Sequence, residues 1–443
     1  MSNARLWLLV VAACAALAGW WALAPAAGPA QEVSARRPLF AEAEIPIERV
    51  DRVEYAPAEG PAMVFRKERG GWMQVQPYEH PADAAAIRQI IDVAASLEST
   101  RTVDAGQAEA LGVASPRARL TLGWQGGSSS ILLGRRTVAG RAWVRVDGRP
   151  QIASVSAALH GLTVEADPRQ WRSMALYDPS RGEAERIALK YGGERPVPWV
   201  LERTDGRWKV VAPLVTRADD EAVRGYLEAL ARAEADAFAA DQPKDLAAFG
   251  LAAPVLGVEI QQGKETSRVE VGTPVAQGAV ERFARVNGRP AVLQLGVKAL
   301  AAIFPPRQFF VDPRGCDAHP ADVRGVSFTP RGAAGPAFTL ERQRDQWTMR
   351  LADGQSGVAA APAVRRLLEQ LAETRAPEVA FQAPPDDTVL GLFTLVGEGG
   401  APLATVRVAR EPGSGKWALD NQDGVLRVFP ASLDLQLQPD SYR

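Results

Sequence analysis

The sequence has few cysteine and histidine residues and almost no net charge. Cys14 and Cys316 are the only cysteines among 443 residues, and Cys14 stands in an apolar run, so a disulfide framework is excluded. Histidine is limited to His80, His160 and His319. The 51 basic and 52 acidic side chains leave a formal charge of −1, and no basic stripe is visible. We therefore expect no nucleic-acid partner.

The remaining composition is that of a folded protein. Hydrophobic residues make up 47% of the chain and charged residues 23%, which excludes a disordered polymer. A chain of this length is too long for one ordinary hydrophobic core, so we expect two to four domains.

An uncharged apolar run occupies Leu6–Leu23. As a helix it would be roughly 27 Å long, close to the thickness of the hydrocarbon core of a bilayer. Trp20 and Trp21 end the run, where indoles favour the membrane interface. We expect a signal-anchor transmembrane helix over residues 1–24 and a Pro/Ala-rich tether over residues 25–44. A cleaved signal peptide and a lipoprotein signal with a lipid on Cys14 remain as alternatives.

The positive charges on the two sides of this run nearly balance, so they do not decide its orientation. The usual outcome for such a segment leaves the bulk of the chain outside the cytoplasm. The expected location is thus the inner membrane, single-pass, with the bulk of the chain in the periplasm or its extracytoplasmic equivalent.

A short tryptophan-containing phrase occurs three times at nearly equal intervals. It reads GGWMQV around Trp72, DGRWKV around Trp208 and RDQWTM around Trp347. Each phrase follows an alternating apolar and polar run and a short turn, which predicts a β-hairpin with one buried face. Each indole is interpreted as a core anchor of its own unit.

The segments that follow the tryptophans repeat as well. An amphipathic helix comes next in each copy, with Pro81 or Asp219-Asp220 suited to its start, then a Gly-containing turn and alternating strand-like runs. The predicted fold class is α+β: a transmembrane helix and three tandem α+β modules, each with a hairpin, an amphipathic helix and antiparallel strands. The expected modules cover residues 45–165, 166–305 and 306–443, the third being degenerate.

These units resemble the bacterial domain of unknown function 4340 family. In the second unit the resemblance is carried by Trp208, Pro213, Leu246, Phe249, Gly250, Leu251, Pro254, Val271, Gly272 and Asn287-Gly288. In the first it is carried by Trp72, Pro77, Leu111, Gly112, Val113, Pro116, Leu133, Gly134 and Asp147-Gly148. In the third unit the spacing drifts and the proline after the glycine motif is absent, so the resemblance covers most of residues 45–317.

The resemblance implies a membrane-anchored extracytoplasmic protein. Some members are similar to auxiliary components of ABC-type transport systems linked to gliding motility, which implies transporter subunits as partners. The family brings no established catalytic residues, so none is transferred to this chain.

Several short segments contain residue types that can support catalysis or metal binding. The densest cluster contains Asp312, Cys316, Asp317, His319 and Asp322, but no second Cys/His pair exists to complete a tetrahedral metal site, and a domain junction is the favoured interpretation.

The other segments also favour structural roles. Glu411–Trp417 lacks the first glycine and the Ser/Thr of a phosphate loop and is interpreted as a hairpin tip, and Gly123–Ser130 is interpreted as a turn. The carboxylates of Asp219-Asp220-Glu221 fit a helix start and those of Asp386-Asp387 a loop. We expect no catalytic, cofactor-binding or metal-binding residues and no cofactor.

The sequence therefore favours a non-enzymatic protein: a membrane-tethered extracytoplasmic binding or scaffold protein of unknown ligand, acting as an auxiliary component of an ABC-type transport system. Two alternatives stay open. One is a cell-envelope hydrolase acting on glycan or peptide, and the other is a structural spacer.

Overall fold

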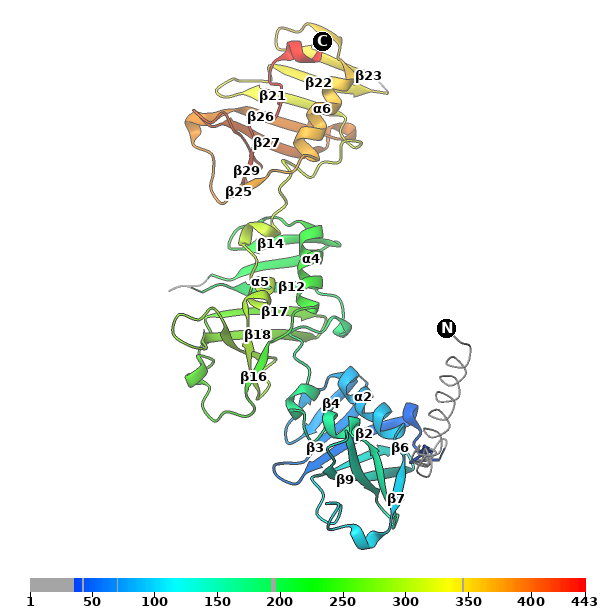
Figure 1. Cartoon of the computed structure of the whole chain (residues 1–443). Coiled ribbons are helices and arrows are strands. Elements are labelled where there is room, and N and C mark those ends of the chain that lie inside the picture. The colour runs from blue at the N-terminus through cyan, green and yellow to red at the C-terminus, as the bar shows by residue number, and fades with distance from the viewer. Residues whose placement is uncertain (1–35, 42–43, 70, 193–196, 345) are drawn as a thin grey trace, which may run out of the picture. The chain divides into compact units, whose positions relative to one another are not determined.

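The computed structural model describes residues 36–443 except 42–43, 70, 193–196 and 345. Two compact units are present, the first ending at Ser173 and the second spanning Met174–Arg443. The first unit contains one nine-stranded antiparallel sheet and the second contains two (Figure 1). We refer to them as the first, second and third sheets in chain order.

The first sheet has the strand order β5-β4-β3-β2-β8-β9-β10-β11-β7. Its β2–β3–β4 meander is joined to the β8–β11 meander by the pairing of β2 with β8, and β7 closes the far edge beside β11. The strands are β2 (Val50–Pro57), β3 (Met63–Glu68), β4 (Gly71–Gln76), β5 (His80–Pro81), β7 (Arg101–Val103), β8 (Ala118–Trp124), β9 (Gly127–Arg136), β10 (Arg141–Val146) and β11 (Ile152–Ser156).

The second sheet has the equivalent order β15-β14-β13-β12-β17-β18-β19-β20-β16. Its strands are β12 (Arg186–Lys190), β13 (Trp199–Thr204), β14 (Arg207–Ala212), β15 (Thr216–Arg217), β16 (Ala237–Ala240), β17 (Leu256–Gln262), β18 (Glu265–Pro274), β19 (Arg282–Val286) and β20 (Val292–Leu295).

The third sheet repeats this order as β24-β23-β22-β21-β26-β27-β28-β29-β25. Its strands are β21 (Gly325–Pro330), β22 (Phe338–Gln343), β23 (Gln346–Leu351), β24 (Ser356–Val358), β25 (Glu378–Ala380), β26 (Val389–Val396), β27 (Pro402–Arg410), β28 (Trp417–Asp420) and β29 (Leu426–Phe429).

One twelve-residue helix accompanies each sheet: α2 (Ala84–Ala95), α4 (Asp220–Ala231) and α6 (Ala361–Ala372). Leu227, which was expected in the apolar stripe of α4, is only half-buried. The other expected members of the stripe are buried in each helix, as predicted. They are Ile87, Ile90, Ile91 and Ala94 in α2, Val223, Tyr226 and Leu230 in α4, and Val364, Leu367, Leu368 and Leu371 in α6.

The helix starts depend on capping residues. Asp83 and Asp219 cap α2 and α4 by accepting hydrogen bonds from backbone N–H groups of the first turn. Pro81, the residue expected at the first start, lies in β5 instead. Two shorter helices, α3 (Ala158–Leu162) and α5 (Val297–Ile303), pack beside α2 and α4.

The three tryptophans occupy the same position in the three sheets, as the repeated phrase predicts. Each lies on the second strand of a hairpin, opposite Lys67, Arg203 or Arg342 of the preceding strand. Trp208 and Trp347 are buried, whereas Trp72 is half-buried against the core of the first sheet.

The glycines of the family motif hold a short turn against the sheet. Gly250 ends the turn with φ of 67°, in the left-handed region. A Cβ on Gly272 of β18 would lie 2.0 Å from the carbonyl oxygen of Phe249, so only glycine permits this approach. Gly134 occupies the equivalent place in the first sheet, where a Cβ would lie 2.6 Å from the carbonyl oxygen of Leu111.

The predicted fold class, α+β after a transmembrane helix, is wrong. The chain is mostly β, with 41% of residues in strands and 20% in helices, because each nine-stranded sheet is accompanied by only one twelve-residue helix and, in the first two, one shorter helix. The ninth strands β7, β16 and β25 and the edge strands β5, β15 and β24 are two to four residues long. Segments of that length carry no measurable periodicity, so the sequence did not predict them.

The expected membrane helix over residues 1–24 and most of the tether lie outside the described residues. Among the helices that are described, none combines the length and the apolar character needed to cross a bilayer, so the transmembrane helix is not supported. Of the expected tether, β1 (Arg37–Pro38) pairs with β6 (Glu98–Ser99) and Phe40 is buried in the first core.

Candidate functional site

The segment between the second and third sheets makes a β-bridge with each of them. Val311 pairs with Ala218, next to β15, and Arg314 pairs with Arg375, just after α6. The N–H of Asp312 also donates to the carbonyl of Arg217, at 3.0 Å. We call the residues around this segment the junction, and all of them belong to the second unit.

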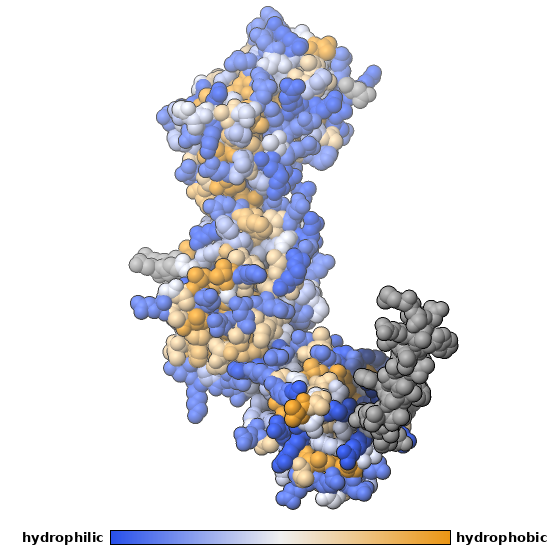
Figure 2. Space-filling view, viewed as in Figure 1, coloured by the Kyte–Doolittle hydropathy of each residue, from blue (hydrophilic) through white to orange (hydrophobic). Residues whose placement is uncertain are grey.

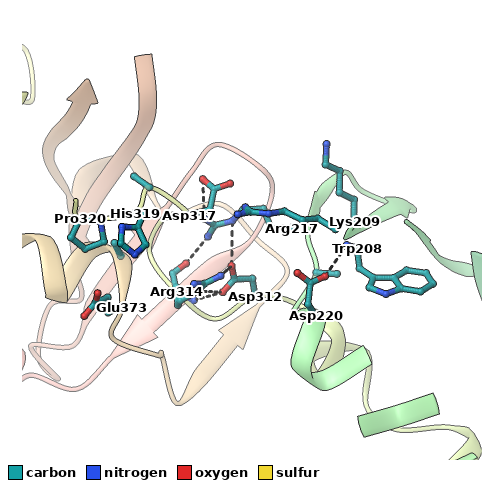
Figure 3. A pocket seen from close by; sticks show the side chains of 14 residues that line it. Trp208, Lys209, Arg217, Asp220, Asp312, Arg314, Asp317, His319, Pro320 and Glu373 are labelled. Carbon is teal, nitrogen blue, oxygen red and sulfur yellow. Dashed lines mark hydrogen bonds and ion pairs between the residues drawn. The ribbon is translucent and has the colours of Figure 1, made fainter. Parts of the chain in front are cut away.

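Four charged side chains form an ion cluster at the junction (Figure 3). Arg314 donates from Nε and Nη2 to both carboxylate oxygens of Asp312, at 2.9 and 2.8 Å. Arg217 lies between two carboxylates, with Nε 3.8 Å from Asp312 and Nη1 3.5 Å from Asp317. Its Nη2 donates to the carbonyl of Arg314 at 2.6 Å. This cluster links β15 to the segment that leads into the third sheet.

Burial and ion pairing shift the pKa values of these groups in opposite directions. Burial alone would raise the pKa of Asp312, but the hydrogen bonds from Arg314 and the charge of Arg217 outweigh it and lower that pKa. Burial lowers the pKa of Arg217, against the attraction of Asp312. Asp312 is therefore held as a carboxylate, which suits an ion pair and not a general acid.

A second, deeper group lies beside this cluster. Arg427 of β29 has no exposed surface, and it donates to both carboxylate oxygens of Asp423 and to the carbonyl of Asp312. Thr216 of β15 donates its hydroxyl to Asp423 at 2.6 Å. Burial raises the pKa of Asp423, but the hydrogen bonds and charge of Arg427 outweigh it and lower that pKa. The ion pair itself lies within the third module, and its bonds to Thr216 and to the carbonyl of Asp312 connect it to the second sheet and to the linking segment.

Two further contacts cross the junction. Arg375 pairs with Asp219, the residue that caps α4, so one carboxylate serves both the helix start and the junction. The rings of Trp199 and Phe381 lie 5.2 Å apart at a tilted angle. Because Trp199 is buried, this contact adds apolar area to an otherwise charged junction.

A cleft of about 360 Å³ opens at the junction. Its described lining carries no hydroxyl or thiol, so it offers no serine- or cysteine-type nucleophile. The lining presents charge of both signs instead. Figure 3 shows Lys209 on one side of the ion cluster, pointing away from it, and His319 and Glu373 on the other side of the cluster. The charged lining residues are Arg207, Lys209, Arg217, Arg314, Asp220, Asp312, Asp317 and Glu373.

The densest sequence cluster falls at this junction, but it does not converge on one point. Asp312 is bound by arginines, and Cys316 is buried in the core of the third sheet, where burial raises its thiol pKa. The Nδ1 of His319 accepts from the N–H of Ala321 at 3.3 Å. Asp322 closes a turn with His319 through its N–H. No group of three or more metal-ligating side chains is found in the described part of the chain.

The other segments singled out in the sequence have structural roles. Asp219 and Asp220 accept backbone N–H groups, from the first turn of α4 and from Trp208 respectively. Glu411–Trp417 connects β27 to β28 and Gly123–Ser130 turns from β8 into β9, as expected. Asp386-Asp387 is exposed in a short turn.

The residues that hold the junction were not found from the sequence. Arg217, Asp423 and Arg427 occur in no motif, and the hydrogen bond of Thr216 to Asp423 joins residues 207 positions apart. The nearest signal in the sequence is an aromatic residue followed by Asp-Pro at the two places where one module leads into the next, Tyr177–Pro179 and Phe310–Pro313.

Comparison with known proteins gives one match. The family described as domain of unknown function (DUF4340) matches residues 72–209 and, a second time, residues 208–392. The two matched ranges together cover most of the chain and overlap at residues 208–209. No curated protein and no solved structure matches the chain.

Proposed function

Because the chain belongs to the DUF4340 family, we propose that it is a non-enzymatic binding and scaffold protein that acts on the extracytoplasmic side of the inner membrane as an auxiliary component of an ABC-type transport system. The transporter and the location come from the family resemblance and from the uncharged run Leu6–Leu23. The binding role is argued from the junction.

The observation that supports this proposal is the buried ion pair of Arg427 and Asp423, with its bonds to Thr216 and Asp312. Breaking such a pair is costly, and its bonds to Thr216 and to the carbonyl of Asp312 favour one arrangement of the second and third sheets. A scaffold needs its surfaces at fixed positions relative to one another. The junction meets that requirement, whereas a flexible linker would not.

The cleft at the junction is the surface best suited to a partner. Its mixed charges match a protein segment that carries both signs better than they match a simple anion. Exposed Lys209 stands at its rim, and Figure 2 shows hydrophilic side chains over most of the visible surface, interrupted by apolar patches. Charged rims of this kind set partner choice and association rate.

The test is site-specific photocrosslinking in native membranes. A photoreactive amino acid at Lys209 is expected to capture an integral membrane protein, identified by mass spectrometry as a transporter subunit. The matched control is Lys264, an exposed lysine in the turn between β17 and β18 that is not part of the cleft. Capture from both positions, or from neither, contradicts the proposal.

Two other experimental outcomes would favour one of the alternative functions over a transporter-associated scaffold. Hydrolysis of envelope glycan or peptide by the purified chain, lost on substitution of cleft residues, would favour the hydrolase. Unchanged transport after charge reversal at Lys209, without any captured protein, would favour a spacer. Fractionation with protease treatment of spheroplasts tests the location separately.

A further inference from the structure

The helix of the second module, α4, leaves an apolar residue accessible that the other two modules bury. Leu227 follows the capping residue Asp219 by eight positions, just as Ile91 follows Asp83 in α2. Ile91 is 2% exposed and Leu368, at the equivalent position of α6, is 4% exposed, whereas Leu227 is half-buried. This helix position is therefore covered in the first and third modules and only partly covered in the second.

In the first module, the segment before β2 covers the helix. The 3-10 helix η1 (Ile47–Arg49) lies against α2, and Ile45 just before it is 6% exposed. Arg88 of α2 donates to both carboxylate oxygens of Glu48, at 2.7 and 3.3 Å, and from Nε to Asp92 at 2.9 Å. Aliphatic side chains and one Glu–Arg pair thus hold this segment on the helix.

The corresponding segment of the second module is three residues shorter. Leu39 and Leu176 correspond, because each donates its N–H to the carbonyl of the residue fourteen positions after the helix cap. Val53 and Ile187 correspond, because each pairs with the residue two positions before the one that faces the hairpin tryptophan. Fourteen positions separate the first pair of ends and eleven separate the second, so the second module has less chain with which to cover its helix.

A groove of about 690 Å³ runs along α4 beside this shorter segment. The side chains of Tyr177 and Trp208, which are buried, and of Leu227 and Ala231, which are half-buried, give it an apolar lining. All of its lining residues belong to the second unit, and α4 is labelled in Figure 1. The groove can therefore take up an aliphatic side chain, as the first module does with its own chain.

The charged side chains beside the groove repeat those of α2 with one exception. Arg224 takes the place of Arg88, five positions after the cap, and Glu228 takes the place of Asp92. In the described part of the chain, Arg224 makes no ion pair, because the shorter segment brings no carboxylate to the place of Glu48. An exposed guanidinium next to an apolar groove suits a ligand that supplies its own carboxylate.

We propose that the groove along α4 is a docking site for a short segment of a partner protein in which an aliphatic residue is followed directly by Glu or Asp. The aliphatic side chain packs on Leu227 and Ala231, and the carboxylate pairs with Arg224. This goes beyond the proposed function, because it assigns a second surface and the chemistry of its ligand, and it needs no transporter.

A second copy of this chain does not supply the segment. Its own Ile47-Glu48 is held on α2 by the pair with Arg88, and Ile45 is buried in the first core, so release would require the first module to open. The occupant is therefore a different protein that presents the same pattern on an accessible segment.

The first test measures binding of a synthetic peptide to the full chain in a mild detergent. The probe is a fluorescein-labelled peptide with the sequence of Glu44–Val50, EIPIERV, which has the required pattern. Fluorescence anisotropy should show saturable binding with a Kd at or below about 1 mM. Arg224→Glu should weaken binding at least about tenfold. Arg365→Glu, at the equivalent exposed position of α6, is the matched control and should bind as wild type.

A charge exchange separates the ion pair from a general effect on the fold. A peptide with Glu48→Lys should bind the wild-type chain at least about tenfold more weakly than the original peptide. It should bind the Arg224→Glu chain more tightly than the original peptide does. Arg224 is exposed, and circular dichroism establishes that each variant is folded.

The second test identifies the occupant in native membranes with a photoreactive amino acid at Leu227. The captured protein should differ from this chain, and mass spectrometry should place the crosslink on a segment with an aliphatic residue followed by Glu or Asp. An excess of the peptide should prevent capture, and the same amino acid at Arg365 should not capture that segment.

Four results would overturn the proposal: no saturable peptide binding below about 1 mM, equal weakening by Arg224→Glu and Arg365→Glu, no recovery on charge exchange, or a crosslink to another copy or another segment of this chain. Lys209 does not line this groove, and Arg224 does not line the junction cleft. The inference and the proposed function can therefore fail separately.

Discussion

Replacing Arg427 by methionine should open the junction between the second and third sheets. Arg427 is fully buried and makes five hydrogen bonds, two of them with Asp423. Methionine keeps most of the side-chain volume but leaves the carboxylate of Asp423 buried without its partner. Removing one member of a buried ion pair costs about 3–5 kcal/mol. We expect the junction to lose about 3 kcal/mol, since Asp423 retains the hydroxyl of Thr216 and is 14% exposed.

Trypsin provides a direct assay, because Arg314 lies in the junction and is followed by Gly315. Cleavage there requires local opening, so its rate follows the free energy of opening when reclosing is fast. A loss of about 3 kcal/mol corresponds to cleavage more than about a hundredfold faster. N-terminal sequencing of the fragment that begins at Gly315 identifies the event.

Two variants make the result specific. Arg268→Met breaks a half-exposed pair with Glu259 on the second sheet and should change stability by no more than about 0.5 kcal/mol. Asp423→Asn combined with Arg427→Met removes both charges and should recover at least about 1 kcal/mol. If Arg427→Met speeds cleavage after Arg314 by less than about fivefold, the junction is not held by this ion pair.

Three further predictions concern pH, packing and reactivity. The folded-state pKa values of Asp312 and Asp423 are lowered, so the stability that these carboxylates contribute is present at neutral pH. It is lost as the pH falls through the lowered pKa values, below the ordinary aspartate range. Urea unfolding midpoints measured from pH 7 to 2 should therefore fall, and a rising midpoint would contradict the assignment. Gly272→Ala should destabilise the chain by about 1–3 kcal/mol in urea unfolding, because the new Cβ would collide with the carbonyl of Phe249. Gly225→Ala, at an open position inside α4, should instead stabilise the chain by about 0.5–1 kcal/mol. Equal effects of the two substitutions would refute the packing argument. Cys316, whose pKa is raised by burial, should react with iodoacetamide far more slowly in the native chain than in urea, and equal rates would mean that its thiol is accessible.

The parts of the fold that were predicted have long, local patterns. The second strand of the hairpin around Trp208 alternates exposed and buried residues from Arg207 to Val210, and α4 repeats its apolar residues at three- and four-residue steps, so periodicity identified both. The ninth strand β16 has four residues and pairs with β20, more than fifty positions later. Its place depends on tertiary contacts, which a local pattern does not encode.

The candidate site was predicted less well than the fold. Asp312 and Asp317 were noticed because they stand close to Cys316 and His319 in the sequence, and a domain junction was favoured over a metal site for this cluster. Asp312 is hydrogen-bonded by Arg314, and both carboxylates also face Arg217, about a hundred positions earlier, which the sequence did not indicate; Cys316 belongs to the core instead. A single sequence gives the residue types of a junction but not its pairing, because the pairs form only when two modules meet.

The claim that the junction holds the second and third sheets in one arrangement is tested most directly by the distance between these sheets in the full chain. Spin labels at Thr266→Cys of β18 and Leu403→Cys of β27, two exposed positions, can be placed in a Cys14→Ser chain and measured by double electron–electron resonance. We expect one narrow distance distribution in the wild-type background, which broadens when Arg427→Met is added. A broad distribution in the wild-type background would contradict this claim, because the two sheets would then move independently and the junction would hold no fixed surface.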